Sequence, residues 1–94
     1  MSNSDAITEP HKQLDYRLLG LLQHHEEGLT MREMFSLLET SEYLAVRYRL
    51  RKLGAAGLLK WSWREGEKRF YVTRKGTKLL EELAYELKGD SQRE

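Results

Sequence analysis

Apolar residues recur at helical spacing through the first part of the chain. The first run predicts a helix over about residues 11–26, and it consists of Leu14, Leu18, Leu21, Leu22 and His25. A second, shorter helix is predicted over about 31–38. Thr30 and Glu33 form a capping box before it, in which the threonine oxygen accepts from a free amide and the glutamate reaches back. These patterns predict two successive helices.

A third helix is predicted over about 41–56, and its two faces differ in character. Val46, Leu50 and Leu53 lie within a narrow arc of the helical wheel, so we expect them in the core. The opposite face is basic and aromatic, and it carries Leu44, Arg47, Tyr48, Arg51 and Lys52. A helix with one apolar stripe and a basic outer face has the amphipathicity that a groove-inserting helix needs.

Strict alternation of apolar and polar residues then replaces the helical spacing. Leu59, Trp61 and Trp63 point to one side of a first strand, and a second strand over 68–72 follows a short glycine-containing loop. Together they predict a β-hairpin over about 59–73. Because a lone hairpin is not stable in water, it must pack on helices, and we expect Trp61 in that core.

The last helix is predicted over about 74–88, with Thr73 as its N-cap. Its apolar face contains Leu79, Leu80, Leu83 and Leu87, and the remainder is acidic, with Glu81, Glu82 and Glu86. We expect residues 1–10 to be a flexible arm and 89–94 a flexible tail around one domain over 11–88. The predicted order is helix, helix, helix, hairpin, helix, a mostly α fold with a small β-hairpin.

Length and composition narrow the class of protein. A chain of 94 residues has room for one small domain, and 39% apolar with 33% charged residues is typical of a soluble globular protein. No stretch approaches the roughly 18 apolar residues of a membrane span. The chain has no cysteine, which excludes disulfides and thiolate chemistry. With no signal pattern at the N-terminus, we expect a cytoplasmic protein without a membrane partner.

The net charge of +1 hides a strong asymmetry along the chain. Between Tyr43 and Lys78 lie 11 of the 16 basic residues but only two of the 15 acidic ones, so this segment carries +9 and the rest −8. A basic centre between acidic ends is expected of a surface that binds a polyanion, provided that folding gathers the charges on one side.

Two short helices joined by a tight turn, the second amphipathic and basic, match the helix-turn-helix motif. Beyond this motif, the chain resembles winged helix-turn-helix transcription regulators of the MarR and PadR groups. The segment from Leu50 to Lys60 is similar to the end of their recognition helix and the start of their wing. The segment from Phe70 to Gly76 is similar to their second wing strand and the start of the next helix. The resemblance covers about residues 14–87.

This resemblance implies a transcription regulator, most often a repressor, whose partner is double-stranded DNA. The third helix would enter the major groove and the hairpin would lie on the flanking backbone. Base edges would be met by Ser41, Leu44, Ala45, Arg47 and Tyr48. Phosphates would be met by Arg51 and Lys52, and the wing would bind backbone or minor groove through Arg64, Lys68 and Arg69.

We also expect a homodimer that binds two half-sites about one helical turn apart. A single small module buries only about 600–1,000 Å² on DNA, which favours pairing. Tyr16, Leu19 and Tyr85 lie off the predicted core faces and are the candidate interface residues.

The sequence contains no set of residues for catalysis or metal binding. There is no glycine-rich phosphate loop and no Gly-x-Ser-x-Gly motif. His24 and His25 are adjacent, so on a helix they point about 100° apart and cannot readily hold one ion together. We therefore expect no enzymatic activity, no metal and no other cofactor.

Two other functions stay open. A winged helix can serve as a protein-interaction module of a larger complex, which predicts an apolar or acidic outer face on the third helix. Arg47, Arg51 and Lys52 argue against that alternative, whereas Leu44 and Tyr48 leave it open. Binding of RNA or single-stranded DNA through Trp61 and Trp63 is the other, and it predicts that both rings are exposed.

Overall fold

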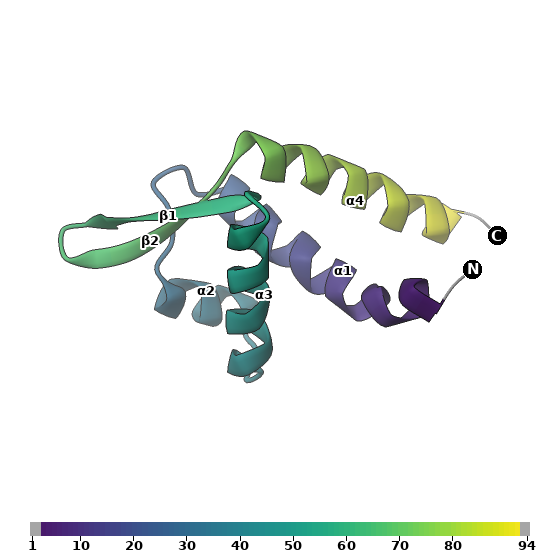
Figure 1. Ribbon diagram of the computed structural model, residues 1–94, viewed down its shortest axis with the longest axis horizontal. Helices are drawn as coiled ribbons and strands as arrows, with labels where there is room; N and C mark the ends of the chain where they lie inside the picture. Colours follow the sequence, from purple (N-terminus) through teal and green to yellow (C-terminus); the bar gives the residue numbers. More distant parts are fainter. Residues whose placement is uncertain (1–2, 93–94) are drawn as a thin grey trace.

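The computed structural model describes the backbone of residues 3–92 and the side chains of residues 11–87 (Figure 1). The elements follow in the predicted order: α1 (Asn3–Gln23), α2 (Met31–Leu38), α3 (Tyr43–Ala55), β1 (Leu59–Arg64), β2 (Glu67–Val72) and α4 (Arg74–Gln92). The predicted fold class, mostly α with one β-hairpin, is confirmed. The β1–β2 hairpin is called the wing below.

The outer helices are longer than the periodicity predicts. Helix α1 begins at Asn3 rather than near residue 11, and α4 ends at Gln92 rather than near residue 88. These extensions contain few apolar residues, so a search for an apolar stripe does not detect them. The flexibility of residues 1–10 and 89–94 stays a prediction, and residues 1–2 and 93–94 lie outside the described residues.

Side-chain caps mark the first residues of α2 and α4. Both capping-box bonds are present, with Thr30 Oγ1 3.2 Å from the Glu33 amide and Glu33 Oε1 3.0 Å from the Thr30 amide. Thr73 Oγ1 accepts from the Gly76 amide at 3.0 Å, which confirms its capping role in α4. Helix α3 starts at Tyr43 without a side-chain cap.

Leucines from all four helices form one core beneath the base of the wing. Helix α1 lies at its centre and contacts α2, α3, α4 and β2. Its fully buried residues are Leu18, Leu19 and Leu22. The prediction that Leu19 belongs to a dimer interface is therefore wrong. Because partners surround α1 on several sides, its buried face is wider than the stripe seen in the sequence.

The wing is a two-stranded antiparallel hairpin whose base is held by the α1–α2 loop. Trp61 pairs with Phe70 and Trp63 with Lys68 in its register. Leu29 extends the sheet by one bridge, with mutual backbone bonds to Phe70 of 3.1 and 2.8 Å. The turn residues Glu65 and Gly66 both have positive φ, 54° and 80°, as two-residue hairpin turns require.

The prediction that Trp61 belongs to the core is wrong. The alternation is correct, because Leu59, Trp61 and Phe70 share one face of the wing. However, the wing extends well beyond the helices, so only its base is covered (Figure 1). Leu59 and Phe70 are buried there, whereas Trp61 is 49% exposed.

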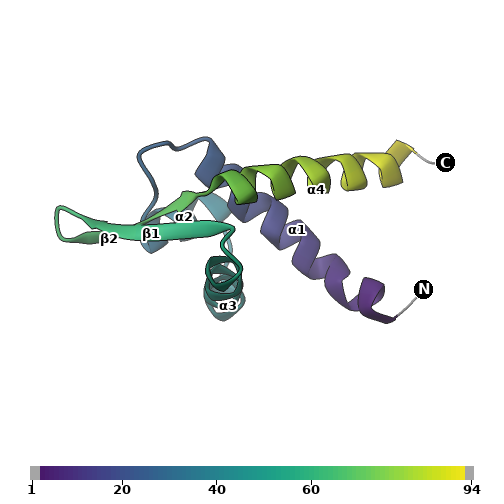
Figure 2. The same cartoon turned by 45° about the horizontal axis from the view of Figure 1, so that its top comes forward.

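Helix α3 and the wing together form one side of the domain. Figure 2 looks almost along the axis of α3, and in this view α3 lies on the side of the molecule opposite α4. The wing extends away from the ends of α1 and α4 along the 48 Å long axis of the molecule. Helix α4, which carries Glu81, Glu82 and Glu86, is thereby separated from the outer face of α3.

Candidate nucleic-acid interface

The outer face of α3 is accessible along its whole length. Val46, Leu50 and Leu53 are buried as predicted, and this burial turns the opposite side of the helix outward. The exposed residues include every candidate assigned to this region: Ser41, Leu44, Ala45, Arg47, Tyr48, Arg51 and Lys52. Leu44 is 81% exposed, the highest value of any large apolar side chain described.

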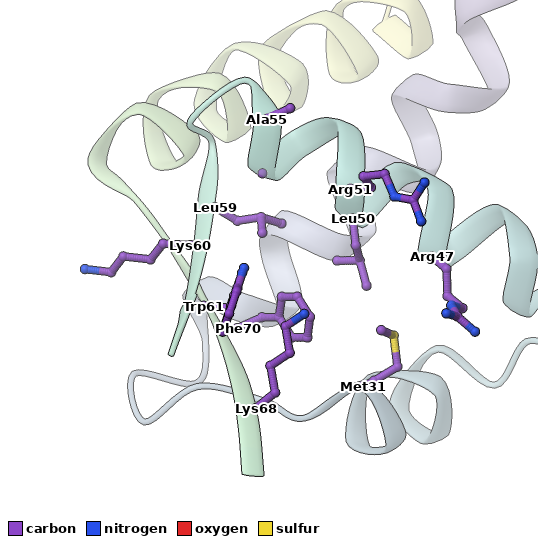
Figure 3. Close-up of a pocket in the computed structure, with 11 residues that line it drawn as sticks. Met31, Arg47, Leu50, Arg51, Ala55, Leu59, Lys60, Trp61, Lys68 and Phe70 are labelled. Atoms are coloured by element: carbon purple, nitrogen blue, oxygen red, sulfur yellow. The ribbon is translucent and has the colours of Figure 1, made fainter. Parts of the chain in front are cut away.

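A hollow of about 510 Å³ lies between α3 and the wing (Figure 3). Its floor is apolar, with Leu50, Leu59 and Phe70 among the lining residues. Arg47 and Arg51 approach it from α3, and Lys68 and Trp61 from the wing. Lys60 also contributes to the lining, but its side chain points away in Figure 3. This feature is called the α3–wing hollow below.

The α3–wing hollow is strongly cationic. No acidic residue lines it. Within residues 11–87, the ion pairs involve Lys12, Arg49, Arg69 and His25, and neither Arg47 nor Arg51 is among them. Guanidinium groups without an internal carboxylate partner are free to bind phosphate, whose geometry they match with two parallel bonds.

The remaining wing candidates lie on the other face of the hairpin. Arg69 donates to the carbonyl of Gly28 at 2.9 Å and lies 3.5 Å from Glu33, so it joins the wing to the start of α2. Arg64 donates to the Tyr71 hydroxyl at 3.3 Å. Burial alone raises the pKa of Tyr71, but bonds from Ser62 and Arg64 and the charges of Arg64 and Arg69 outweigh it and lower that pKa.

Alternation therefore divides the predicted wing contacts into two groups. Lys68 faces α3, whereas Arg64 and Arg69 face away, because neighbouring residues of a strand point to opposite sides. The predicted set missed Lys60 and Trp61, which also line the α3–wing hollow. Their place in a basic, aromatic strand beside the predicted recognition helix is the signal that could have found them.

One basic residue of α3, Arg49, forms a largely buried ion pair. Arg49 donates to both carboxylate oxygens of Asp15 on α1 at 2.9 Å, and both side chains are largely buried. The bonds to Asp15 raise the pKa of Arg49, against the opposing effect of burial. An arginine guanidinium is charged in proteins in any case, so Arg49 and Asp15 form an ion pair. This pair fixes α3 against α1 and removes Arg49 from the exposed basic set.

Membrane-spanning helices and metal-binding clusters are both absent from the described residues. No helix among them is long and apolar enough to cross a bilayer. Within the same part of the chain, no group of three or more histidine, aspartate or glutamate side chains is placed to hold a metal ion.

The order of three helices, hairpin and helix, with the hairpin beside the second helix of a helix-turn-helix, defines a winged helix-turn-helix fold. No protein-family model and no curated protein matches the chain. Two solved variants of MepR from S. aureus, one from a multidrug-resistant clinical isolate, are similar to it with TM-scores of 0.70 and 0.71. Their identities to this chain are 22% and 21%, over 98% of this chain and 80% and 81% of theirs.

The SSV1 protein F-93 is also similar, with a TM-score of 0.63 and 19% identity over 86% of this chain and 92% of its own. At these identities the similarity establishes the fold. Residue roles must therefore come from the chemistry of this chain.

Proposed function

We propose that the protein is a transcription regulator that binds double-stranded DNA with α3 and the wing. The observation that carries this proposal is the α3–wing hollow, where Arg47, Arg51 and Lys68 converge without an acidic neighbour in the lining. The outer face of α3 is exposed next to this hollow. The major groove of B-DNA is about 12 Å wide and admits one α-helix, so α3 fits into it. The winged-helix fold shared with MepR and F-93 supports the same function.

The proposed contacts follow from position. Ser41, in the turn before α3, and Leu44, Ala45 and Tyr48, in the first half of that helix, face base edges, where a recognition helix reads sequence. Arg47, Arg51 and Lys52 flank them and bind phosphate or base, and Lys68 holds the backbone beside the wing. Arg64 lies near the wing tip and reaches the flanking backbone or minor groove. Arg69 is assigned to holding the wing on α2, because its guanidinium already has partners there.

We further propose that the regulator is a MarR- or PadR-like repressor that occupies its operator and blocks polymerase. It is a binding protein without catalytic activity. Selection of bound DNA fragments identifies the operator sequence, and a ligand screen tests for a small-molecule effector.

Replacing both Arg47 and Arg51 with alanine is expected to weaken binding to duplex DNA by about 10- to 100-fold at moderate salt. Each lost phosphate contact should also lower the slope of log affinity against log salt by about one. Fluorescence anisotropy with a labelled duplex of about 30 base pairs, measured over a salt series, tests both effects.

The matched control removes the same charge from α4. The Arg74→Ala, Lys78→Ala double variant lies at the start of that helix, outside α3 and the wing, and should bind almost as tightly as the unaltered protein. Equal losses in the two double variants would mean that only net charge matters. Unchanged binding by a folded Arg47→Ala, Arg51→Ala variant would refute the role of α3.

We also propose that two copies pair through α1 and α4. The N-terminal end of α1 and the C-terminal end of α4 project from the domain on the side away from the wing (Figure 1). Tyr85 on α4 is 79% exposed, and Tyr16 and Leu37 are partly exposed beside a shallow apolar groove between α1, α2 and α4. A dimer built this way leaves both copies of α3 free for two half-sites.

The Tyr85→Glu variant is expected to shift the protein from dimer to monomer, because a charge would be buried without a partner at the interface. Sedimentation equilibrium over a concentration series measures this shift. The Tyr48→Glu variant makes the same change on α3 and should leave the dimer intact. Monomeric behaviour of the unaltered protein at tens of micromolar would contradict the dimer itself.

A further inference from the structure

The wing exposes two aromatic rings to solvent. Trp61 and Trp63 are the two tryptophans of the chain, and they are 49% and 64% exposed. Leaving such large rings in water gives up the stabilisation that burial would contribute. Exposed aromatic surface next to a cationic hollow is typical of a binding site rather than of ordinary surface.

The two rings and one lysine form a single arrangement on the face of the wing that looks toward α3. The ring centroids lie 6.2 Å apart and the planes are at 89°, an edge-to-face pair. The Lys68 ammonium lies 4.2 Å from the Trp61 ring centroid and 5.4 Å from that of Phe70. We call Trp61, Trp63 and Lys68 the tryptophan platform. Because the Lys68 ammonium lies against the Trp61 ring, a phosphate bound to this ammonium would lie beside an aromatic face.

The tryptophan face of the wing gains positive charge from α3. The platform continues into the α3–wing hollow, where Arg47 and Arg51 add to the charge of Lys68 and no acid lines the surface (Figure 3). The opposite face of the wing is also basic, but it is not continuous with α3, and there Arg69 lies near Glu33 and Glu67. A nucleic-acid strand that follows the basic residues of α3 therefore meets the tryptophan side of the wing.

We propose that the tryptophan platform stacks on unpaired bases of a DNA strand that continues from the duplex bound by α3. Stacking on aromatic rings is open to every base, because each base has a π-face, and a positively charged groove follows the backbone. Bases inside an intact duplex are covered on both faces by their neighbours, so they cannot stack on the platform without being unstacked. The preferred ligand is thus duplex DNA with an adjoining single-stranded segment. This inference rests on the proposed duplex binding by α3.

The test compares a blunt duplex of about 30 base pairs with the same duplex carrying a thymidine tail of about eight nucleotides. The tail is expected to raise the affinity of the unaltered protein by about 10-fold. The Trp61→Ala, Trp63→Ala variant should lose this gain, so that it binds the tailed and the blunt duplex with equal affinity. The Trp61→Phe, Trp63→Phe variant should keep most of the gain, because the rings remain.

Tryptophan emission gives a second, label-free measurement. Since both tryptophans lie on β1, the emission of the whole protein reports on the wing alone. Stacking should quench it strongly with the tailed duplex and weakly with the blunt one. Variants that retain one tryptophan each, Trp61→Phe and Trp63→Phe, show which ring takes part.

Each outcome distinguishes the inference from the function on which it rests. Equal affinity for both DNAs, or a preference for the tail that survives in the alanine variant, overturns the platform and leaves duplex binding standing. Binding to the tailed but not to the blunt duplex supports the platform and contradicts duplex recognition by α3. Tighter binding to a uridine RNA tail than to the thymidine tail overturns the assignment to DNA. No binding to any of these ligands overturns both proposals.

Discussion

Replacing Asp15 with alanine is expected to lower the free energy of unfolding by about 3–5 kcal/mol. The carboxylate accepts two bonds of 2.9 Å from Arg49, and only 16% of the Arg49 side chain and 11% of the Asp15 side chain is exposed. Without Asp15, the guanidinium of Arg49 stays largely buried without its counter-charge, and this unpaired charge accounts for most of the loss. Denaturation by urea, followed by circular dichroism, measures the effect.

Two further variants separate the pair from ordinary surface charge. The Glu86→Ala variant removes a half-exposed ion pair, Lys12 with Glu86 at 3.1 Å, and should cost less than about 1 kcal/mol. The Asp15→Leu, Arg49→Met double variant replaces the buried pair by apolar groups and should recover most of the stability. A loss in Asp15→Ala no larger than that in Glu86→Ala would contradict the assignment of a buried pair.

The Gly76→Ala variant is expected to destabilise the domain by about 3 kcal/mol, although alanine favours helices over glycine by about 1 kcal/mol. A Cβ at Gly76 would overlap the carbonyl oxygen of Leu58 and lie 2.8 Å from Val72 Cγ2. That carbonyl cannot move freely, because it accepts from the Thr73 amide at 3.2 Å. The start of α4 would have to move away from the α3–β1 connection.

The same substitution at Gly20 provides the control. Gly20 lies within α1, and outside its own turn of helix no atom of the described residues would come within 4 Å of an added Cβ. Gly20→Ala should therefore raise the free energy of unfolding by about 0.5–1 kcal/mol through reduced entropy of the unfolded chain. Urea denaturation should therefore show that Gly20→Ala raises the free energy of unfolding and that Gly76→Ala lowers it. A stabilising Gly76→Ala would show that the contact of α4 with Leu58 is loose.

The Asp15→Ala and Gly76→Ala variants alter the contacts that hold α3 and the wing in position, and they leave the proposed DNA-contacting residues unchanged. Asp15 and Arg49 fix α3 against α1, and Gly76 lets α4 lie against the segment that leads from α3 into the wing. Weakened DNA binding in either variant at a temperature where it is folded would indicate that the angle between α3 and the wing matters for affinity.

Sequence patterns predicted the elements well because these patterns are local. The capping box at Thr30 and Glu33 depends on bonds across three residues, and both bonds are present. The alternation from Leu59 to Trp63 correctly places these side chains on one face of a strand. The outer face of α3 also follows from its own apolar stripe, so its exposed candidates could be chosen without knowledge of the other helices.

The sequence by itself therefore determined the order of elements, the caps of α2 and α4 and the basic outer face of α3. Tertiary structure decided which cations remain available: Arg49 is paired with a carboxylate 34 residues away, whereas Arg47 and Arg51 line the hollow beside the wing. It also decided that Trp61 is exposed, because the wing extends beyond the helices that cover its base. Periodicity specifies which way a side chain points from its own element, but its partners depend on which elements pack beside it.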